Sequence, residues 1–454
     1  MERTRKQKSL KRFRLENNPP LFFLLSYASV IVVGTGLLTG PWATQSGEMT
    51  SPIDALFTAT SALCVTGLSP VVSAEHWNIA GQLILLVLIQ LGGLGIMTAA
   101  AAFGMVARRK ITLLDRRVLM EEKGQSGIKG MVRLVRFILL STFAIEAIGA
   151  VLLALSFVPQ FGILKGVWLS VFHSVSAFCN AGFDLLGPAS LSAYTGNVLV
   201  CLTISFLVIV AGIGYTVYME VLDRRRLYRL SLHSKIVLTV TGALLALGTL
   251  GFLLLEYNNP ATLGGLHAPG EKVLAAFFQS VTTRTAGFFS IDQAALRTPS
   301  AVLTIVLMFI GGSPTGTAGG IKTTTVMAII LATIGEIRSD AERPIFHRNL
   351  ARFVFRKAFA IFVIALSWCL LIGFLLCCTE PNASFLDVMF ETVSGFGTVG
   401  LTRNLTPSLS AAGKLLISLD MLFGKIGPLT MMYAVTKKKF PAKFREAEEN
   451  VFIG

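Results

Sequence analysis

Long apolar runs alternate with short polar segments along most of the chain. The longest runs reach the roughly 20 residues that a helix needs to cross the hydrocarbon core of a bilayer. Eight of them cover approximately residues 20–40, 78–107, 134–158, 197–222, 234–256, 301–335, 354–378 and 412–436. The first run is long enough to span and has no small-residue cleavage site, so we expect a helix there and not a removable signal. The pattern predicts an all-α polytopic membrane protein with eight transmembrane helices.

Taken in order, the eight runs form four consecutive pairs. A shorter motif lies between the two runs of each pair and therefore occurs four times. It reads FTATSALCVTG from Phe57, FHSVSAFCNAG from Phe172, FQSVTTRTAG from Phe278 and FETVSGFGTVG from Phe390. The copies recur roughly every 105 to 115 residues, and each passes through small residues to a final glycine. A fixed period of this kind indicates repeated structural units.

Each copy of the motif predicts a short helix followed by an extended turn. The short helices are expected over residues 51–63, 166–178, 271–282 and 384–395. Thirteen residues of helix measure roughly 20 Å, which is enough to dip into a membrane but not to cross it. We therefore expect four pseudo-fourfold helix–pore-loop–helix repeats around one central pore. The predicted divisions are 1–110 (basic arm and repeat 1), 111–222 (repeat 2), 223–338 (repeat 3), 339–436 (repeat 4) and 437–454 (cytoplasmic tail).

The positive charge of the chain follows a topological pattern. The chain is 53% hydrophobic and 14% charged, and its net charge is +15. Of its 40 Lys and Arg residues, 32 lie in residues 1–14, 108–136, 223–235, 336–357 and 437–445. These are the two terminal tails and every second loop, and cytoplasmic loops carry such an excess. We therefore expect both termini to be cytoplasmic, and we expect no nucleic-acid binding, which needs one contiguous basic face.

The four turns carry the chemistry expected of an ion filter. A dehydrated monovalent cation needs a ring of partly negative oxygens, which backbone carbonyls from several chain segments can supply. Glycine tolerates the unusual backbone angles that such a turn demands. The short helices would direct the negative ends of their dipoles at the centre. The turns contain no Asp or Glu, and we expect Arg284 to lie behind the filter as a hydrogen-bond donor.

A second glycine cluster recurs about 25 to 30 residues beyond each filter glycine. The clusters lie at residues 92–95, 212–214, 311–325 and 424–428. In the first two copies, plain helix packing and a functional break are equally compatible with the sequence. The third copy reads GGSPTGTAGGIKTTT, which is too rich in glycine and proline for a continuous helix. It predicts an intramembrane loop or a break that lines a cavity.

This combination of motifs resembles the Trk/Ktr/HKT superfamily of potassium transporters over about residues 20–436, and eight helices look like its Ktr-type membrane subunit. The resemblance implies selectivity-filter segments formed by Cys64, Val65, Thr66, Gly67, Cys179, Asn180, Ala181, Gly182, Arg284, Thr285, Ala286, Gly287, Gly397, Thr398, Val399 and Gly400. It implies K⁺ ligation by the backbone carbonyls of Thr66, Gly67, Ala181, Gly182, Ala286, Gly287, Val399 and Gly400. A glycine in all four copies is typical of K⁺-selective members.

The resemblance also implies an intramembrane gate below the filter. Its residues would be Gly311, Gly312, Ser313, Pro314, Thr315, Gly316, Thr317, Ala318, Gly319, Gly320, Lys322 and Lys425. Many relatives carry arginine in the fourth glycine cluster, where this chain has Lys425. A charged group at membrane depth indicates function, and the alternative is a lysine that merely pairs with Asp420.

Three other polar residues in apolar surroundings have a simpler interpretation. Glu146 and Glu391 are expected to be buried, hydrogen-bonded carboxylates and not parts of a proton relay. His173 occupies in copy two the position of Glu391 in copy four. That position is therefore expected to need a polar anchor but no specific charge.

The resemblance implies a K⁺-translocating subunit of the bacterial plasma membrane that forms a homodimer. It also implies docking on a cytosolic nucleotide-binding ring of the RCK type, with Na⁺ as an activator or symported ion. We expect no covalently bound cofactor and no enzymatic activity, since the sequence holds no nucleotide phosphate loop and no metal or nucleophile cluster. A secondary transporter of a small organic solute is the alternative, because glycine-broken helices also occur there. Such proteins usually show two inverted halves, whereas this chain has four units of like orientation.

Overall fold

The computed structural model describes residues 19–106, 119–120, 130–224, 226–338, 346, 348 and 350–435. Within these ranges the regular elements are helices, and the predicted all-α polytopic fold is confirmed. The N-terminal arm, the C-terminal tail, most of the basic loop 108–136 and residues 339–345, 347 and 349 of the basic loop 336–357 lie outside the described residues.

Each of the four repeats contains a long first helix and a short second one. The first helices are α2 (Pro19–Thr39), α8 (Met131–Phe161), α12 (Leu232–Glu256) and α16 (Arg352–Thr379). The short helices are α3 (Pro52–Cys64), α9 (Ile163–Phe178), α13 (Pro269–Thr282) and α17 (Phe385–Gly397). The short helices begin and end close to the predicted positions. In α3 and α17 the helix takes in the first residue of the predicted turn, Cys64 and Gly397, and the rest of each turn follows the helix.

The last helix of each repeat is broken into two pieces. The pairs are α5 (Ile79–Leu94) with α6 (Ile96–Val106), α10 (Val198–Ile213) with α11 (Tyr215–Arg224), α14 (Thr298–Phe309) with α15 (Thr323–Ile337), and α18 (Ala411–Ile426) with α19 (Pro428–Val435). In three pairs the two pieces meet at 96°, 91° and 101°. The apolar runs 78–107, 197–222 and 412–436 are therefore bent pairs and not single straight helices.

Glycines explain both the breaks and the packing beside them. The bends fall at Gly95, Gly214 and Gly427, whose φ angles of +87°, +96° and +92° favour glycine. Within the same clusters, a Cβ on Gly92 would lie 1.9 Å from the carbonyl oxygen of Leu63, at the end of α3. The glycines of one cluster thus serve both roles that the sequence left open, since they admit a neighbouring backbone and also end the helix.

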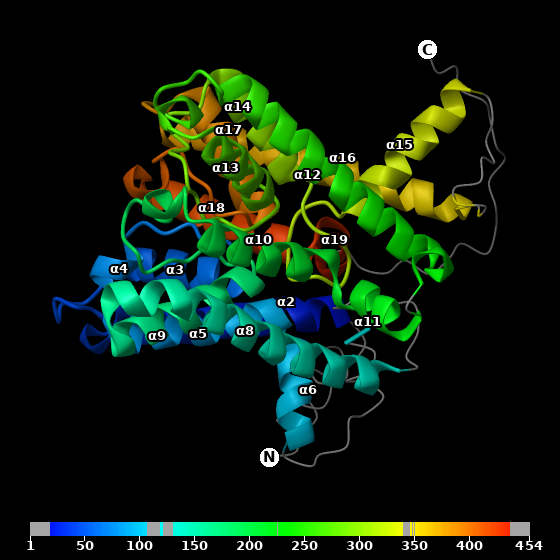
Figure 1. Ribbon diagram of the computed structural model, residues 1–454. Coiled ribbons are helices and arrows are strands. Elements are labelled where there is room, and N and C mark those ends of the chain that lie inside the picture. The colour runs from blue at the N-terminus through cyan, green and yellow to red at the C-terminus, as the bar shows by residue number, and fades with distance from the viewer. Residues whose placement is uncertain are drawn as a thin grey trace, which may run out of the picture.

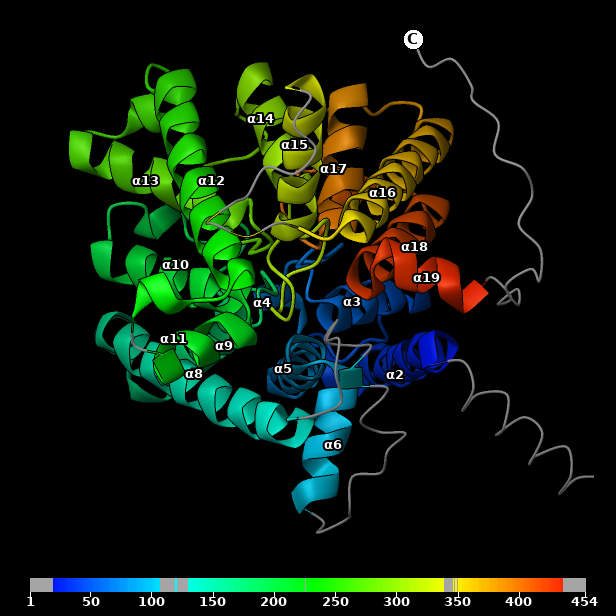
Figure 2. The same cartoon turned by 90° about the vertical axis from the view of Figure 1, so that its right-hand side faces the viewer.

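The four repeats follow one another around a central axis. Figure 2 shows them in chain order, from blue through teal and green to orange and red. Neighbouring repeats pack through α5 on α9, α10 on α13, and α14 on α17, and the ring closes where α18 packs on α3. Figure 1 shows the same bundle from the side, with the bent helix α6 projecting from it.

The packing separates an inner core from an outer apolar surface. The phenylalanine that opens each motif (Phe57, Phe172, Phe278 and Phe390) is at most 1% exposed, so the short helices are held in the middle of the bundle. The long first helices instead expose large apolar side chains, among them Leu155, Leu254 and Phe374. Four helices are long and apolar enough to cross a membrane, and three bent pairs pass the same test among the described residues. The outer surface is therefore suited to lipid.

Candidate functional site

The four predicted turns meet in a closed ring. A Cβ added to Gly67 would lie 2.6 Å from the carbonyl oxygen of Ala181, and one on Gly182 would lie 2.8 Å from that of Ala286. A Cβ on Gly287 would lie 2.6 Å from the carbonyl oxygen of Val399, and one on Gly400 would lie 2.1 Å from that of Thr66. Each final glycine therefore touches the turn of the next repeat, and the last touches the first. No larger residue fits at these contacts without displacing a carbonyl.

The turns share one backbone conformation. The second residue of each turn is left-handed, with φ of 52° at Val65, 57° at Asn180, 68° at Thr285 and 51° at Thr398. The final glycines also have positive φ, between +68° and +98°. Left-handed angles are unfavourable for β-branched residues, so the surrounding structure must hold these turns in place. Val65, Thr285 and Thr398 are β-branched, whereas Asn180 tolerates this region, and strain at three equivalent places indicates a functional site.

A hydroxyl group in each short helix binds the turn that follows. Ser61 accepts from the amide of Gly67 at 3.1 Å, and Ser394 accepts from the amide of Gly400 at 3.2 Å. Ser176 donates to the carbonyl of Phe183 at 2.7 Å, and Thr282 donates in the same way to Phe288. Sequence reasoning missed these residues, although a Ser or Thr stands at the same place in all four motifs.

A second set of side chains joins the short helices to the segments beyond the turns. His173 accepts from the amide of Leu185 at 3.4 Å, and Gln279 bonds with Gln293 at 2.7 Å. Glu391 accepts from Thr402 at 2.7 Å and from Thr406. These residues stand directly after the motif phenylalanine in copies two, three and four, and there the expectation of a polar anchor without a specific charge is confirmed. In copy one the position holds Thr58, whose hydroxyl has no hydrogen-bond partner among the described residues.

Arg284 lies beside the ring, in the third repeat. The residue is 7% exposed and lines a small cavity with Val208, Ile209, Gly212 and Leu245. Its Nε atom has no hydrogen-bond partner among the described residues. The expected donor role is therefore not observed for this atom.

The predicted intramembrane loop lies between α14 and α15 and docks on repeat 2. The amide of Ser313 donates to the carbonyl of Gly212 at 2.9 Å, and the hydroxyls of Thr315 and Thr216 lie 2.9 Å apart. These contacts hold the loop against the break between α10 and α11. The glycine clusters of repeats 2 and 3 thus bind one another, which their separate sequences did not indicate.

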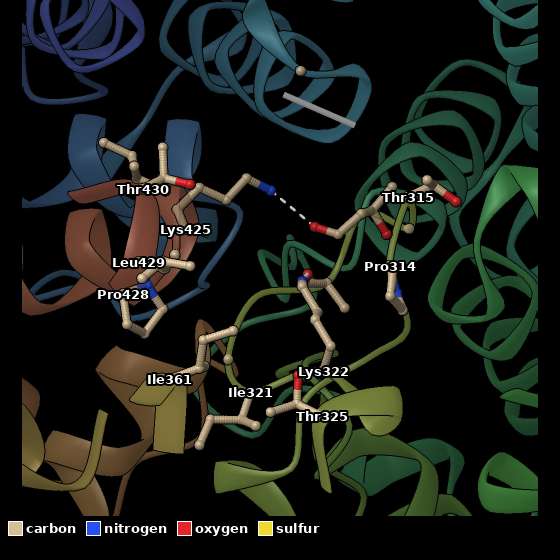
Figure 3. A pocket seen from close by; sticks show the side chains of 18 of the residues that line it. Pro314, Thr315, Ile321, Lys322, Thr325, Ile361, Lys425, Pro428, Leu429 and Thr430 are labelled. Atoms are coloured by element: carbon tan, nitrogen blue, oxygen red, sulfur yellow. Dashed lines mark hydrogen bonds between the residues drawn. The ribbon is translucent and has the colours of Figure 1, made fainter. Parts of the chain in front are cut away.

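Two lysines hold the loop across a cavity. The cavity has a volume of about 320 Å³ and is lined by the loop, by Gly92 and Gly93 of α5 and by the α18–α19 break. Lys425 extends across it and donates to the carbonyl of Thr317 at 2.8 Å (Figure 3). Lys322 donates to the next carbonyl, that of Ala318, at 2.6 Å. The two ammonium groups therefore occupy carbonyl oxygens that a free cation could otherwise approach.

The buried carboxylates lie outside this cavity. Glu146 accepts from Gln90 at 3.1 Å, as expected of a hydrogen-bonded core carboxylate. Asp420 accepts from Trp368 at 2.9 Å, and its second oxygen has no hydrogen-bond partner among the described residues. No cluster of three His, Cys, Asp or Glu side chains suited to a metal ion occurs in that part of the chain. The site consists of main-chain oxygens and helix termini, which suit a weakly held monovalent ion.

A fourfold ring of left-handed turns inside an all-helical membrane bundle defines a protein of the ion-conducting class. A family model described as cation transport protein, TrkH, matches residues 25–445. The chain therefore belongs to the TrkH family of cation transport proteins.

Several characterised relatives match over nearly the whole chain. The Ktr system potassium uptake protein B of Bacillus subtilis is 42% identical over 99% of this chain and 99% of its own length. The potassium/sodium uptake protein NtpJ of Enterococcus hirae is 40% identical over 98% and 99%. The crystal structure of the potassium transporter TrkH from Vibrio parahaemolyticus matches with a TM-score of 0.72, at 18% identity, over 91% of this chain and 83% of that one. This last match shows a shared fold.

Proposed function

We propose that this chain is the ion-translocating membrane subunit of a K⁺ uptake system. The relatives that match along its whole length are named as potassium or potassium/sodium uptake proteins. The observation that carries the proposal is the closed ring of four turns, each in contact with a carbonyl oxygen of the next. A protein of this kind moves ions and catalyses no reaction.

The ring would select K⁺ with its backbone carbonyls. The proposed ligands are the oxygens of Thr66, Gly67, Ala181, Gly182, Ala286, Gly287, Val399 and Gly400. Carbonyl dipoles replace the hydration shell of the ion without binding it too tightly to leave. The short helices α3, α9, α13 and α17 all end at the ring, so that their C-terminal dipoles add negative potential there.

The loop of residues 310–322 would form the gate. It crosses between repeats 2 and 4, and Lys425 holds it through Thr317. A cation that enters the cavity would meet two ammonium groups before it reached the cytoplasmic side. Opening therefore requires the loop to leave its contacts with Gly212 and Lys425.

The membrane, topology and partners that we propose for the chain are based on its resemblance to the Ktr-type subunits and on the distribution of its charge. The word "system" in the name of the Bacillus subtilis relative supports further components. We propose a homodimer in the bacterial plasma membrane with both termini in the cytoplasm. A nucleotide-binding ring would control it from the cytoplasm, and Na⁺ would serve as activator or coupled ion.

Complementation tests the proposal directly. The full-length chain, expressed in a bacterium that lacks its own K⁺ uptake systems, should restore growth at limiting K⁺. The variant Gly400→Ser should restore growth less well and admit more Na⁺. Growth that stays defective with the chain present in the membrane and its regulatory partner supplied, together with uptake of an organic solute, would favour the secondary-transporter alternative.

A further inference from the structure

One side chain of the ring contacts the loop. The amide of Gly319 donates a hydrogen bond of 3.1 Å to the hydroxyl of Thr398, the second residue of the fourth turn. A Cβ on Gly319 would lie 2.4 Å from that hydroxyl, so only glycine allows the loop to approach so closely. Beside it, a Cβ on Gly320 would lie 3.4 Å from the Cα of Gly397. The main chain of the loop therefore contacts the side chain of Thr398 in the filter.

The backbone conformation of Thr398 is intrinsically unfavourable for a threonine. Its φ of 51° is left-handed, its side chain is fully buried, and its amide caps α17 by donating to Gly395 at 3.0 Å. A β-branched residue in this region is strained, and such strain persists only where neighbouring contacts hold it. The bond from the loop is one of the contacts that fix this turn.

The equivalent residues of the other turns differ in their partners. Val65 in the first turn has no hydroxyl, and Asn180 in the second donates to Thr285 in the third at 3.2 Å. Among the described residues, hydrogen bonds join Thr398 to the loop and Thr285 to another turn. Two threonines at one position of the ring thus have two different environments.

We propose that the Thr398 hydroxyl is a positioning group that couples the loop to the fourth turn of the filter. While the loop is docked, the hydroxyl satisfies the buried amide of Gly319 and the turn keeps its geometry. When the loop withdraws, the amide is satisfied by water, and the fourth turn loses one restraint. Opening of the gate and geometry of the filter are thereby linked. The inference rests on the proposed function.

The test compares uptake of Rb⁺ and Na⁺ by full-length variants in cells without other K⁺ uptake systems. Thr398→Val keeps the shape of the side chain but leaves the amide of Gly319 without an acceptor, which penalises the docked loop. We expect Rb⁺ uptake to rise roughly fivefold, the effect of losing about one hydrogen bond, and the Rb⁺/Na⁺ ratio to fall. Thr398→Ser keeps the hydroxyl and should behave as the parent chain.

Thr285→Val is the matched control, because it removes the same group from the same position of another turn. Thr285 belongs to the filter and accepts from Asn180, so this variant should change the Rb⁺/Na⁺ ratio, but it should not reproduce the rise in Rb⁺ uptake because its hydroxyl does not contact the loop. In a variant that lacks residues 314–319, the donor is absent, so adding Thr398→Val should change neither uptake nor the ratio. Membrane levels of every variant are measured by immunoblot, so that misfolding is recognised.

Three results would overturn the coupling. They are parental uptake by Thr398→Val at normal membrane level, an equal rise in Thr285→Val, or a rise in uptake without any change in the Rb⁺/Na⁺ ratio. Absence of K⁺ uptake by the parent chain itself would instead refute the proposed function, so the two failures are distinguishable.

Discussion

Replacing Gly400 by alanine should damage the filter more than the same change at any other filter glycine. The added Cβ would lie 2.1 Å from the carbonyl oxygen of Thr66, against 2.6 Å or more at Gly67, Gly182 and Gly287. Real Cβ atoms essentially never come closer than 3.0 Å to another heavy atom, so the carbonyl of Thr66 must move by about 0.9 Å. That carbonyl is a proposed K⁺ ligand.

The backbone adds a second cost that can be measured separately. Gly400 and Gly427 share a φ of +92°, which residues with a side chain rarely adopt, so a substitution at either position is strained. A Cβ on Gly427 meets nothing within 4 Å. Gly427→Ala therefore carries the strain without the collision, and it is the matched control.

The assay is the ratio of K⁺ to Na⁺ uptake in cells that lack other K⁺ uptake systems. Displacing one oxygen of the ring should lower this ratio roughly tenfold, which corresponds to about 1.4 kcal/mol of lost discrimination. Gly427→Ala should keep the parental K⁺/Na⁺ ratio. Gly182→Ala should lower the ratio least among the four filter glycines, because its added Cβ lies farthest from its nearest neighbour, at 2.8 Å. Equal ratios in Gly400→Ala and the parent chain would refute the assignment of Thr66 and Gly400 to the filter.

Three further predictions follow from the described contacts. Ser394→Ala removes the acceptor for the amide of Gly400 and should lower the free energy of unfolding, measured in detergent, by roughly 1–3 kcal/mol. The same variant should also have lower K⁺ selectivity. Lys425→Ala removes the charged donor to Thr317 and should raise Rb⁺ flux roughly tenfold, given about 1.5 kcal/mol for such a bond. Burial raises the pKa of Asp184, which lies beyond the second turn, from 3.8 to about 6. Between these two pKa values the folded chain binds more protons than the unfolded chain, so the stability of the fold rises as pH falls from about 6 to about 4. Asp184→Asn should remove this contribution from melting temperatures measured between pH 4 and 6.

Conservative variants separate the causes. Ser394→Thr keeps the hydroxyl and should retain selectivity better than Ser394→Ala. Lys425→Gln keeps a donor without charge and should give a flux between those of the parent chain and Lys425→Ala. A lower flux in a well-folded Lys425→Ala would contradict a barrier role, and an unchanged pH slope in Asp184→Asn would show that another group titrates.

The repeat architecture could be predicted because it leaves a local signal. A phenylalanine, a run of small residues and a glycine at fixed spacing mark each short helix and turn, and the structure has α3 and α17 within two residues of the predicted bounds. The glycine-rich third cluster likewise predicted a loop. These features depend on backbone freedom and apolar length, which are properties of the sequence itself.

The remaining features depend on contacts between repeats and could not be predicted in this way. Gly95 and Gly214 look like packing glycines, and only the docking of neighbouring segments shows that helices end there. The bond from Gly319 to Thr398 joins residues that are 79 positions apart. Asn180 and Thr285 are likewise joined across two repeats. A motif read one copy at a time contains no information about such pairs.

The four repeats are joined in one polypeptide, and this permits an asymmetry that identical subunits could not have. In an assembly of four separate copies, every loop at the axis would be present four times, and four loops like residues 310–322 would compete for the same space. Here one quarter of the bundle supplies the loop, while its neighbours supply the surfaces that receive it, Gly212 on one side and Thr398 on the other. Covalent linkage of the repeats thus allowed each copy to diverge and take on a separate task around a shared passage.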